Sequence, residues 1–486
     1  MSALRAAIAG CGLLCLASAA SGQVEFRVYE GHPRLFLDPD RLQRLRKDVE
    51  RQSLRWQSLR ALIADGTAFD ERPLVDALRF QVAGDRVSGQ SAIGWSERLA
   101  MRGIGTASEL RQAALVYDWC YDLFDAPGRT GLRDVLANAV AALLPQAGLD
   151  PGLVRAAILA SIATAGDWDG SETALATLLG THWELEVLPA LQGGALADDS
   201  AALIAVLETA LAVRHNLESD PMQPGIDSVR ALVRSRPLSY YPLEIDAAGG
   251  TLRWPSRYGL NERAARQNAP LDRIAEMLLV AYESNLPEFQ FLQGWIRDER
   301  YLLSSQLAAP YEFLWVNPYL PGLTPESSPL LAHDPVRGRI FARFAWDQPT
   351  TWLGYSAGRL ELLADGELSA TTSFGELAPL YFPEAAVVPV APPAKVTLSW
   401  EPSRERAPEA ARIYLIGLQA GEAYGLRLGG RAARLVRAGA GGIVVLHSDP
   451  NASRQDRIDL RRKVRLEIRP ALRPAVPGRQ RPTLRP

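Results

Sequence analysis

Histidine and cysteine, the residues that most often bind zinc, are scarce in this chain. It has five histidines and three cysteines among 486 residues. A zinc site needs three or four ligands that converge with fixed geometry, and we find no spacing that predicts one. A phosphate-binding glycine-rich loop and a His-Glu-Xaa-Xaa-His motif are also missing, and we expect no serine-hydrolase nucleophile elbow. We therefore predict no metal and no cofactor.

Two short segments nevertheless combine useful groups. Arg214-His215-Asn216 offers a cation, an imidazole and an amide together, and Arg257-Tyr258 follows the Gly249-Gly250 pair. Each segment also has a simpler interpretation. The helix dipole favours a cation near a helix C-terminus and Asn often ends the helix, which would account for His215 without any chemistry. Tyr258 could equally anchor its loop against neighbouring helices.

The overall charge excludes some partners. The chain has 53 Lys plus Arg against 55 Asp plus Glu, a formal net charge of −2. Such a balance argues against general binding to nucleic acid or to an anionic membrane. No apolar stretch reaches the roughly 18 to 20 residues that span a bilayer, so we expect no integral membrane segment.

Residues 1–22 have the layout of a secretory signal peptide. A charged start with Arg5 is followed by an apolar run from Ala6 to Leu16 and then by small residues. Ile8-Ala9-Gly10-Cys11 resembles a lipoprotein cleavage box, but the apolar stretch before it is short. We expect a secreted or periplasmic protein in which Cys120 is the remaining thiol and packs as a core residue.

Hydrophobic periodicity divides the rest of the chain in two. From about residue 39 to 304, apolar residues recur at three and four spacing between short Gly, Pro or Asp breaks, which is typical of amphipathic helices. The pattern predicts an (α/α) helical toroid over residues 23–310, with a fixed-period solenoid as the alternative. Besides a first helix after Asp38-Pro39, we expect helices over 74–83, 96–124, 129–146, 151–165, 171–191, 197–215, 224–235 and 270–303.

Beyond Pro310 the pattern changes. Closely spaced prolines predict a linker over 311–335, because no helix would cross them intact. Short segments rich in aromatic and β-branched residues then predict an antiparallel β-sandwich over 336–468. Residues 469–486 are rich in Arg and Pro and predict a basic tail. The expected fold class is thus α + β, with a helical toroid followed by a sandwich.

Three segments resemble the heparinase II/III-like family. Gly31-His32-Pro33-Arg34-Leu35-Phe36-Leu37, followed by a charged helix, is similar to the family's opening segment. Ala113 to Tyr121, which contains Tyr-Asp-Trp, resembles its second landmark, and Arg339 to Tyr355 is similar to the strand pair that opens its β domain. The resemblance implies a toroid joined to a sandwich and an acidic polysaccharide or oligosaccharide as partner, cleaved by β-elimination.

β-Elimination requires a group that neutralises the uronate carboxylate, a base and an acid. Family members supply Asn or His and a Tyr from the toroid, together with His from the sheet domain, and some bind zinc. By this resemblance His215 and Asn216 would neutralise the carboxylate, Tyr258 would be the proton donor or base, and Arg257 would contact substrate.

The sheet half departs from the family pattern. Arg359 stands where a histidine would be expected. His333-Asp334 lies in the predicted linker, where a turn or the entry to a strand is the simpler interpretation. A guanidinium group binds a carboxylate or sulfate bidentately but cannot act as a base at neutral pH. Arg359 is therefore predicted to contact an anionic sugar without transferring a proton.

The stretch 282–319 interleaves aromatic residues with amides and arginines. Such a mixture suits sugar binding, because rings stack on pyranoses while polar groups bond to hydroxyls. It predicts Trp295, Tyr311 and Trp315 as substrate contacts. Packing of the same aromatics at the domain interface is the alternative, and clefts favour such interfaces.

A glycoside hydrolase is a further possibility for a helical toroid, with Asp167 and Asp169 as the carboxylate pair. Helix capping explains that pair more simply. The leading hypothesis is therefore a secreted polysaccharide lyase, and its rival is a non-catalytic glycan-binding or scaffold protein on the same fold.

Overall fold

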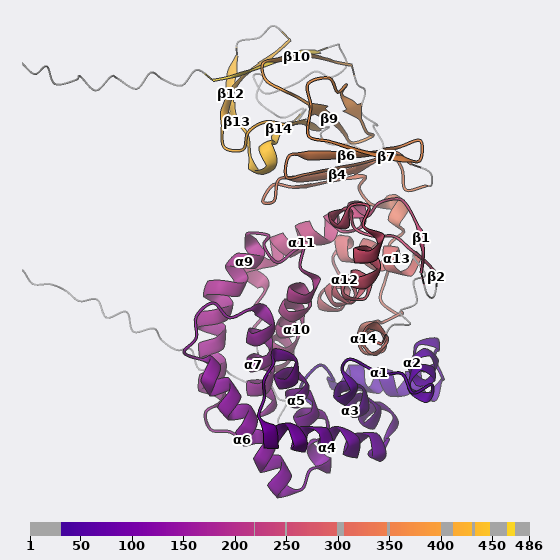
Figure 1. Cartoon of the computed structure of the whole chain (residues 1–486), viewed down its shortest axis with the longest axis vertical. Helices are drawn as coiled ribbons and strands as arrows, with labels where there is room; N and C mark the ends of the chain where they lie inside the picture. The colour runs from indigo at the N-terminus through magenta and orange to yellow at the C-terminus, as the bar shows by residue number, and fades with distance from the viewer. Residues whose placement is uncertain are drawn as a thin grey trace, which may run out of the picture.

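The computed structural model describes residues 31–217, 219–247, 250–298, 306–347, 350–399, 412–429, 433–447 and 464–471. The predicted signal peptide and residues 472–486 of the predicted tail lie outside these ranges. The α + β class is confirmed, because helices occupy the first part of the described chain and sheets the second (Figure 1).

The helical part runs from residue 39 to residue 315. Its helices are α1 (Pro39–Glu50), α2 (Leu54–Ala64), α3 (Arg72–Ala83), α4 (Arg86–Arg102), α5 (Ala107–Trp119), α6 (Ala126–Leu143), α7 (Pro151–Ala163), α8 (Ser171–Thr177), the π-helical η2 (Leu178–Val187), α9 (Leu188–Gln192), α10 (Ser200–Asn216), α11 (Ile226–Ser235), α12 (Glu262–Tyr282), α13 (Pro287–Asp298) and α14 (Ala308–Trp315). Short 3₁₀ turns include η4 (Pro237–Ser239) and η5 (Ser256–Tyr258), and β1 (Ile245–Ala247) pairs with β2 (Gly250–Leu252).

Caps set several helix boundaries. The Asp38 side chain accepts from the Arg41 amide with Pro39 at the first helical position, as the sequence predicted. The single helix expected over 96–124 is wrong: α4 ends at Gly103, whose φ of 86° suits glycine, and Thr106 caps a new helix. Pro270 does not begin a helix but lies inside α12.

The helical part buries one large apolar core. α14 returns to the start of the chain, where Trp315 meets Phe36 edge-on at 5.1 Å and Phe313 lies 5.3 Å from Trp56 between ring centroids. The last helix of this part therefore packs beside the first ones. α14 also extends past residue 310, the predicted end of the helical domain.

Three sheets follow. The first is an antiparallel meander in the order β3 (Leu331–Asp334), β4 (Arg339–Arg343), β5 (Trp352–Ser356), β6 (Arg359–Ala364) and β7 (Glu367–Thr371). The second has the order β14 (Val444–His447), β11 (Arg412–Ile416), β9 (Ala385–Pro389) and β8 (Leu380–Tyr381). The third has the order β10 (Ala394–Leu398), β15 (Val464–Pro470), β12 (Ala423–Leu428) and β13 (Arg434–Arg437).

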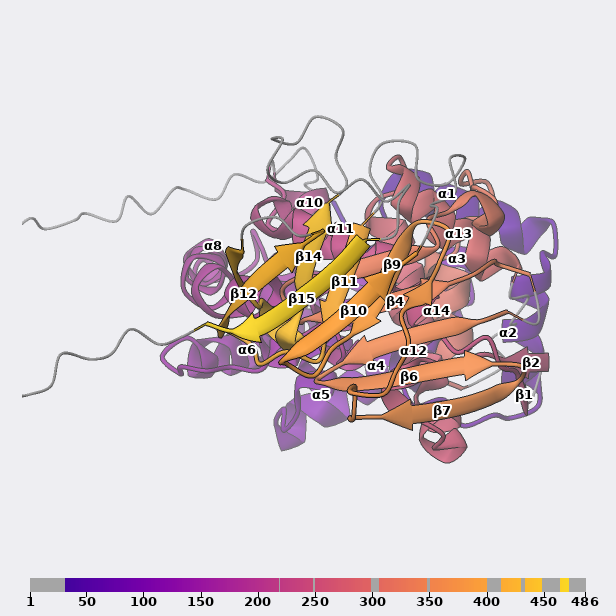
Figure 2. The same ribbon diagram turned by 90° about the horizontal axis from the view of Figure 1, so that it is seen from above.

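The sheets are stacked over the helices (Figures 1 and 2). One apolar cluster joins the first and second sheets and another joins the second and third, so the middle sheet is buried on both faces. β9 and β11 pair in parallel within that middle sheet, which departs from the fully antiparallel arrangement expected. A run of buried apolar residues on both strands suits such a position.

A fourth cluster joins the first sheet to the helical part. Trp352 is fully buried, its indole N–H donates to the Leu238 carbonyl at 2.8 Å, and its ring meets Tyr241 edge-on. Trp254, Ala265, Ala269, Ala332 and Phe341 belong to the same cluster. This contact fixes the sheet against the helices and positions the cleft described next.

Candidate functional site

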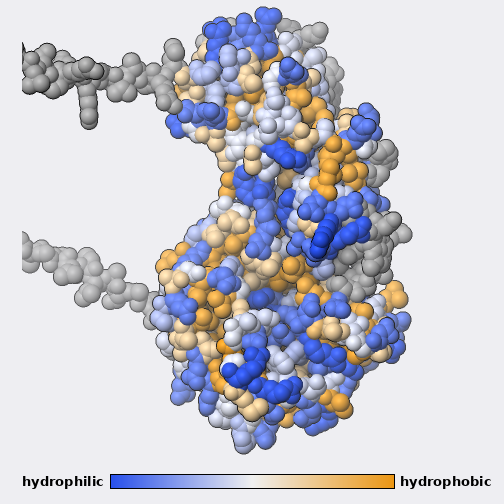
Figure 3. Space-filling model, viewed as in Figure 1, coloured by the Kyte–Doolittle hydropathy of each residue, from blue (hydrophilic) through white to orange (hydrophobic). Residues whose placement is uncertain are grey.

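A cleft of about 530 Å³ lies where the first sheet faces the helices. Its helical side comes from the segment before α10, the end of α11 with η4, and the loop around η5, and its sheet side comes from β4, β5, β6 and the β3–β4 turn. Figure 3 shows hydrophilic surface at this waist between the two parts. Seven charged residues line the cleft: Arg236, Arg257, Arg337, Arg339, Arg359, Asp198 and Glu361.

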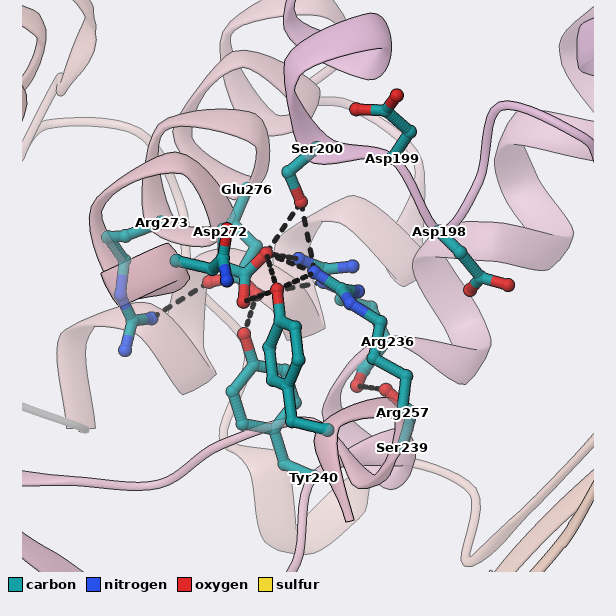
Figure 4. A network of polar contacts seen from close by, with 12 residues as sticks. Asp198, Asp199, Ser200, Arg236, Ser239, Tyr240, Arg257, Asp272, Arg273 and Glu276 are labelled. Atoms are coloured by element: carbon teal, nitrogen blue, oxygen red, sulfur yellow. Dashed lines mark hydrogen bonds and ion pairs between the residues drawn. The ribbon is translucent and has the colours of Figure 1, made fainter. Parts of the chain in front are cut away.

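The helical side is organised by two buried carboxylates of α12 (Figure 4). Arg236 Nε donates to Glu276 Oε1 at 2.9 Å, and the Tyr240 hydroxyl donates to the same oxygen at 2.6 Å. Burial and the charge of Glu276 raise the pKa of Tyr240 well above its ordinary value, so this phenol stays a donor. Arg236 is thereby held at the cleft with only 3% of its surface exposed.

Arg257 and Tyr258 meet the second carboxylate. Arg257 Nη2 donates to Asp272, to Ser200 Oγ at 3.1 Å and to the Tyr258 hydroxyl oxygen at 2.9 Å. The Tyr258 hydroxyl in turn donates to Asp272 Oδ2 at 3.1 Å. Burial and Asp272 raise the pKa of Tyr258, and Arg257 only partly opposes them. Tyr258 therefore keeps its proton at neutral pH and is suited to donate it rather than to act as a base.

Two buried arginine nitrogens on this side lack a hydrogen-bond acceptor among the described residues: Arg236 Nη2 and Arg257 Nε. Arg236 Nη2 lies 3.4 Å from Asp272 Oδ1, an ion pair without hydrogen-bond geometry. An unused donor in a buried site is costly, and an anionic ligand would satisfy it. The helical side can thus accept negative charge from a ligand.

The sheet side adds two further sets of ion pairs, one around Asp198 and one at Glu361. Arg339 binds both carboxylate oxygens of Asp198, and Arg337 Nη1 lies 3.5 Å from the same side chain. Arg359 lies 3.1 Å from Glu361, whose other oxygen accepts from the Tyr241 hydroxyl at 2.7 Å. Arg359 is the most accessible of the five arginines that line the cleft, because 57% of its side chain is exposed.

The structure therefore places Arg257 and Arg359 in one cleft, with Tyr258 hydrogen-bonded to Arg257, but it does not bring His215 and Asn216 there. Ser200, at the first position of α10, touches Arg257, whereas Asn216 is the last residue of that helix, about 24 Å away at 1.5 Å per residue. The predicted constellation of His215, Tyr258 and Arg359 in one cleft is wrong, because a full-length helix separates its members.

His215 and Asn216 have structural roles instead. Asn216 is 1% exposed, and its amide donates to the Arg34 and Ala212 carbonyls at 3.1 and 2.8 Å. His215 Nδ1 lies 3.9 Å from Asp38 Oδ2, in the last turn of α10, where a cation suits the helix dipole. Both residues hold the segment from Arg34 to Asp38 against α10.

The three predicted aromatic contacts lie away from this cleft. Tyr311 is buried, accepts from Arg111 at 2.8 Å and donates to Glu71 at 3.1 Å. Trp315 is 2% exposed, with Arg41 stacked 4.5 Å from its ring. Trp295 borders a separate cavity of about 320 Å³ but is 3% exposed and covered by Arg273. All three belong to the core of the helical part, so packing accounts for their positions, but not the packing at the domain interface that the alternative interpretation gave.

The segments around His32 and Tyr117, two of the three compared with a known family above, contact each other. Asp118, fully buried, accepts from the amides of Arg34 and Leu35 at 2.9 and 2.7 Å and lies 2.6 Å from His32 Nδ1. Asp167, considered as a hydrolase carboxylate, accepts from the Tyr117 and Tyr121 hydroxyls. These residues join α5 to its surroundings and lie outside the cleft lining.

Sequence reasoning missed most of the cleft. Arg236, Asp272 and the Arg337-Gly338-Arg339 turn carried no motif, although two arginines around a glycine between strands were a usable signal. It also missed that Gly354-Tyr355-Ser356-Ala357-Gly358 matches the Gly-Xaa-Ser-Xaa-Gly pattern. That segment forms the β5–β6 hairpin, with Ser356 opposite Arg359, and not the strand-to-helix turn of a nucleophile elbow.

The described residues contain no group of three or more His, Cys, Asp or Glu side chains that could hold a metal ion. Within the same ranges, no helix is long and apolar enough to cross a membrane. No known family model matches the chain, and no curated protein is found to be similar to it.

Proposed function

We propose that this protein binds an acidic oligosaccharide in the cleft between its helices and its first sheet. The observation that carries the proposal is the lining itself: five arginines from both parts of the chain face one cleft, and two of them have buried donors without an acceptor among the described residues. Guanidinium groups match carboxylates and sulfates in geometry as well as in charge.

The remaining lining suits a sugar. Ser235, Ser239, Ser256 and Ser356 offer hydroxyls beside the arginines, and Glu361 offers acceptor oxygens to sugar hydroxyls. The volume lies in the range of small-molecule sites, so the cleft would hold a short stretch of a longer chain. The exposed Arg359 would meet that chain at the rim.

The wider proposal is a secreted member of a heparinase II/III-like group, with an (α/α) toroid and a sandwich. The packing of α14 beside the first helices and the stacked sheets support these finer descriptions of the fold. The mutual contact of the segments around His32 and Asp118 supports the resemblance, since both would then belong to one structural unit.

Polysaccharide lyase activity is the second candidate, and the position of Tyr258 favours it. Its hydroxyl keeps a proton beside Arg257, which lines the cleft, so it could protonate a leaving glycosidic oxygen. β-Elimination also needs a base, and none of the described residues that line the cleft is a histidine. For this reason the binding role, previously the rival hypothesis, is preferred to the lyase role.

Calorimetric titration with tetragalacturonate and with neutral maltotetraose tests the binding role. We expect the acidic sugar alone to bind, and Arg257→Gln to weaken it about 10- to 100-fold, as for loss of a charged hydrogen bond. Arg102→Gln is the matched control, because Arg102 is exposed at the end of α4, and this variant should bind like the wild type. Equal binding of both sugars, or no binding, would contradict the proposal.

Ultraviolet absorbance of the unsaturated product tests the lyase role on the same preparations. An absorbance rise that Tyr258→Phe abolishes, with binding retained, would establish elimination. Binding without any rise over a panel of uronate polymers would leave the protein as a binding protein for those substrates.

A further inference from the structure

The sheet side of the cleft holds a carboxylate already, and that carboxylate comes from the helical part. We infer that Arg337 and Arg339 form an anion subsite of the cleft and that Asp198 occupies this subsite until an acidic ligand replaces it. The inference rests on the proposed function, since it names a second contact for the acidic sugar and a competitor for that contact.

Arg339 binds Asp198 with the geometry by which arginine binds the carboxylate of a ligand. Arg339 Nη1 donates to Asp198 Oδ1 at 2.6 Å and Arg339 Nη2 donates to Asp198 Oδ2, which is the bidentate end-on arrangement by which arginine also binds a free carboxylate. Arg337 Nη1 lies 3.5 Å from Asp198 Oδ1. One carboxylate thus satisfies two guanidinium groups that both line the cleft.

The turn that carries Arg337 and Arg339 is fixed independently of Asp198. The buried Asp334 accepts from the Val336 and Arg337 amides at 3.1 and 3.0 Å and pairs with Arg337 Nε. Gly338, with φ at 63°, completes this turn, and β4 carries Arg339. The turn would therefore keep its shape when Asp198 leaves the subsite.

Asp198 is held less firmly. It lies in the connection between α9 and α10, and 38% of its side chain is exposed, against 11% for Arg337 and 22% for Arg339. Burial raises its pKa, but Arg339, Arg337 and Arg257 together lower it below the ordinary value, so it is ionised at neutral pH. A ligand carboxylate can replace it with little change in the charge of the subsite.

The neighbouring residue provides a matched control. Asp199 carries the same charge but does not line the cleft; it caps α10 by accepting from the Ala201 and Ala202 amides, both at 3.0 Å. Asn caps a helix as well as Asp does, so Asp199→Asn removes one charge without removing the cap. Figure 4 shows the two side chains pointing in different directions.

The test is calorimetric titration of tetragalacturonate into the full chain and its variants. Asp198→Asn should bind about three- to fivefold more tightly than the wild type, the range for a partly exposed ion pair. Asp199→Asn should change affinity less, and Arg339→Gln should weaken binding. In the Arg339→Gln background the gain from Asp198→Asn should disappear. Equal effects of the two Asp variants, or a gain that persists without Arg339, would overturn the inference.

Inorganic sulfate separates this inference from the proposed function. If no form binds tetragalacturonate, the proposed function fails, and the subsite is then judged on sulfate alone. Tighter sulfate binding by Asp198→Asn, lost in Asp198→Asn/Arg339→Gln, would uphold the subsite. Equal sulfate affinity in all forms would reject it. Thermal unfolding of each variant verifies that it is folded.

Discussion

Asn216 has a side chain that could neutralise a carboxylate, but it lies outside the cleft. Its amide stands beside His215 in the sequence, which suggested carboxylate neutralisation, yet it donates to a carbonyl 182 positions away at Arg34. Nothing in the local sequence predicts that long-range contact. The same is true of Asp272, an unremarkable helix residue that becomes the partner of Arg257 and Tyr258 only after folding.

Asn216→Ala should lower the free energy of unfolding by about 1–2 kcal/mol, because it leaves the Arg34 carbonyl without this donor. Sugar binding should not change. Asn268→Ala is the control, since the Asn268 amide donates to Ala264 within its own helix. Urea denaturation measures the difference; loss of sugar binding by folded Asn216→Ala would restore a role at the site.

His333 should make stability depend on pH. Burial is the main cause that lowers its pKa to about 4, below the ordinary value of 6.5. Between these values the unfolded chain takes up a proton that the folded chain does not, so stability falls as pH drops from 6.5 to 4. Because the ring is partly solvated, the loss should be on the order of 1–2 kcal/mol.

Urea denaturation at pH 7.5 and pH 4.5 checks this expectation. His333→Gln should lose less stability on acidification than the wild type. His447→Gln, at an exposed histidine of β14 in the second sheet, should behave like the wild type. Identical losses for all three proteins would show that His333 does not contribute.

At the scale of elements, periodicity and capping predicted most of the helices and several strands. The boundaries that failed have physical reasons: Gly103 interrupts a continuous apolar pattern, and Pro270 is accommodated inside α12. Strand pairing was less accessible, since the parallel contact of β9 with β11 joins segments separated by β10. Short apolar segments do not specify their partners.

Asp118→Asn should detach the N-terminal segment from α5. The buried Asp118 carboxylate accepts from two backbone amides and pairs with His32. The NH₂ group of an asparagine side chain cannot accept these hydrogen bonds and would face the N–H groups that now donate to the carboxylate. We expect a loss of roughly 2–4 kcal/mol in unfolding free energy. Asp122→Asn, at an exposed position of the following turn, should be within about 0.5 kcal/mol of the wild type. Urea denaturation compares them, and equal stabilities would contradict the anchoring role.

At the scale of the whole molecule, the division into helices and sheets was predictable and the cleft between them was not. Because ligands often bind at domain interfaces, a site between the two parts could be expected. Its residues could not, because the lining combines η4, the loop around η5 and three strands of the first sheet. Only Arg257 and Arg359 of the predicted contacts line it. Their meeting depends on the Trp352 cluster that orients the sheet.

The most direct test of the central claim is hydrogen–deuterium exchange of the full chain with and without tetragalacturonate. Binding in the arginine-lined cleft predicts slower exchange in segments 253–259 and 352–361, one from each part of the chain, and no change with maltotetraose. Protection confined to residues 34–38 and to the end of α10 around His215, or no protection at saturating tetragalacturonate, would contradict the claim.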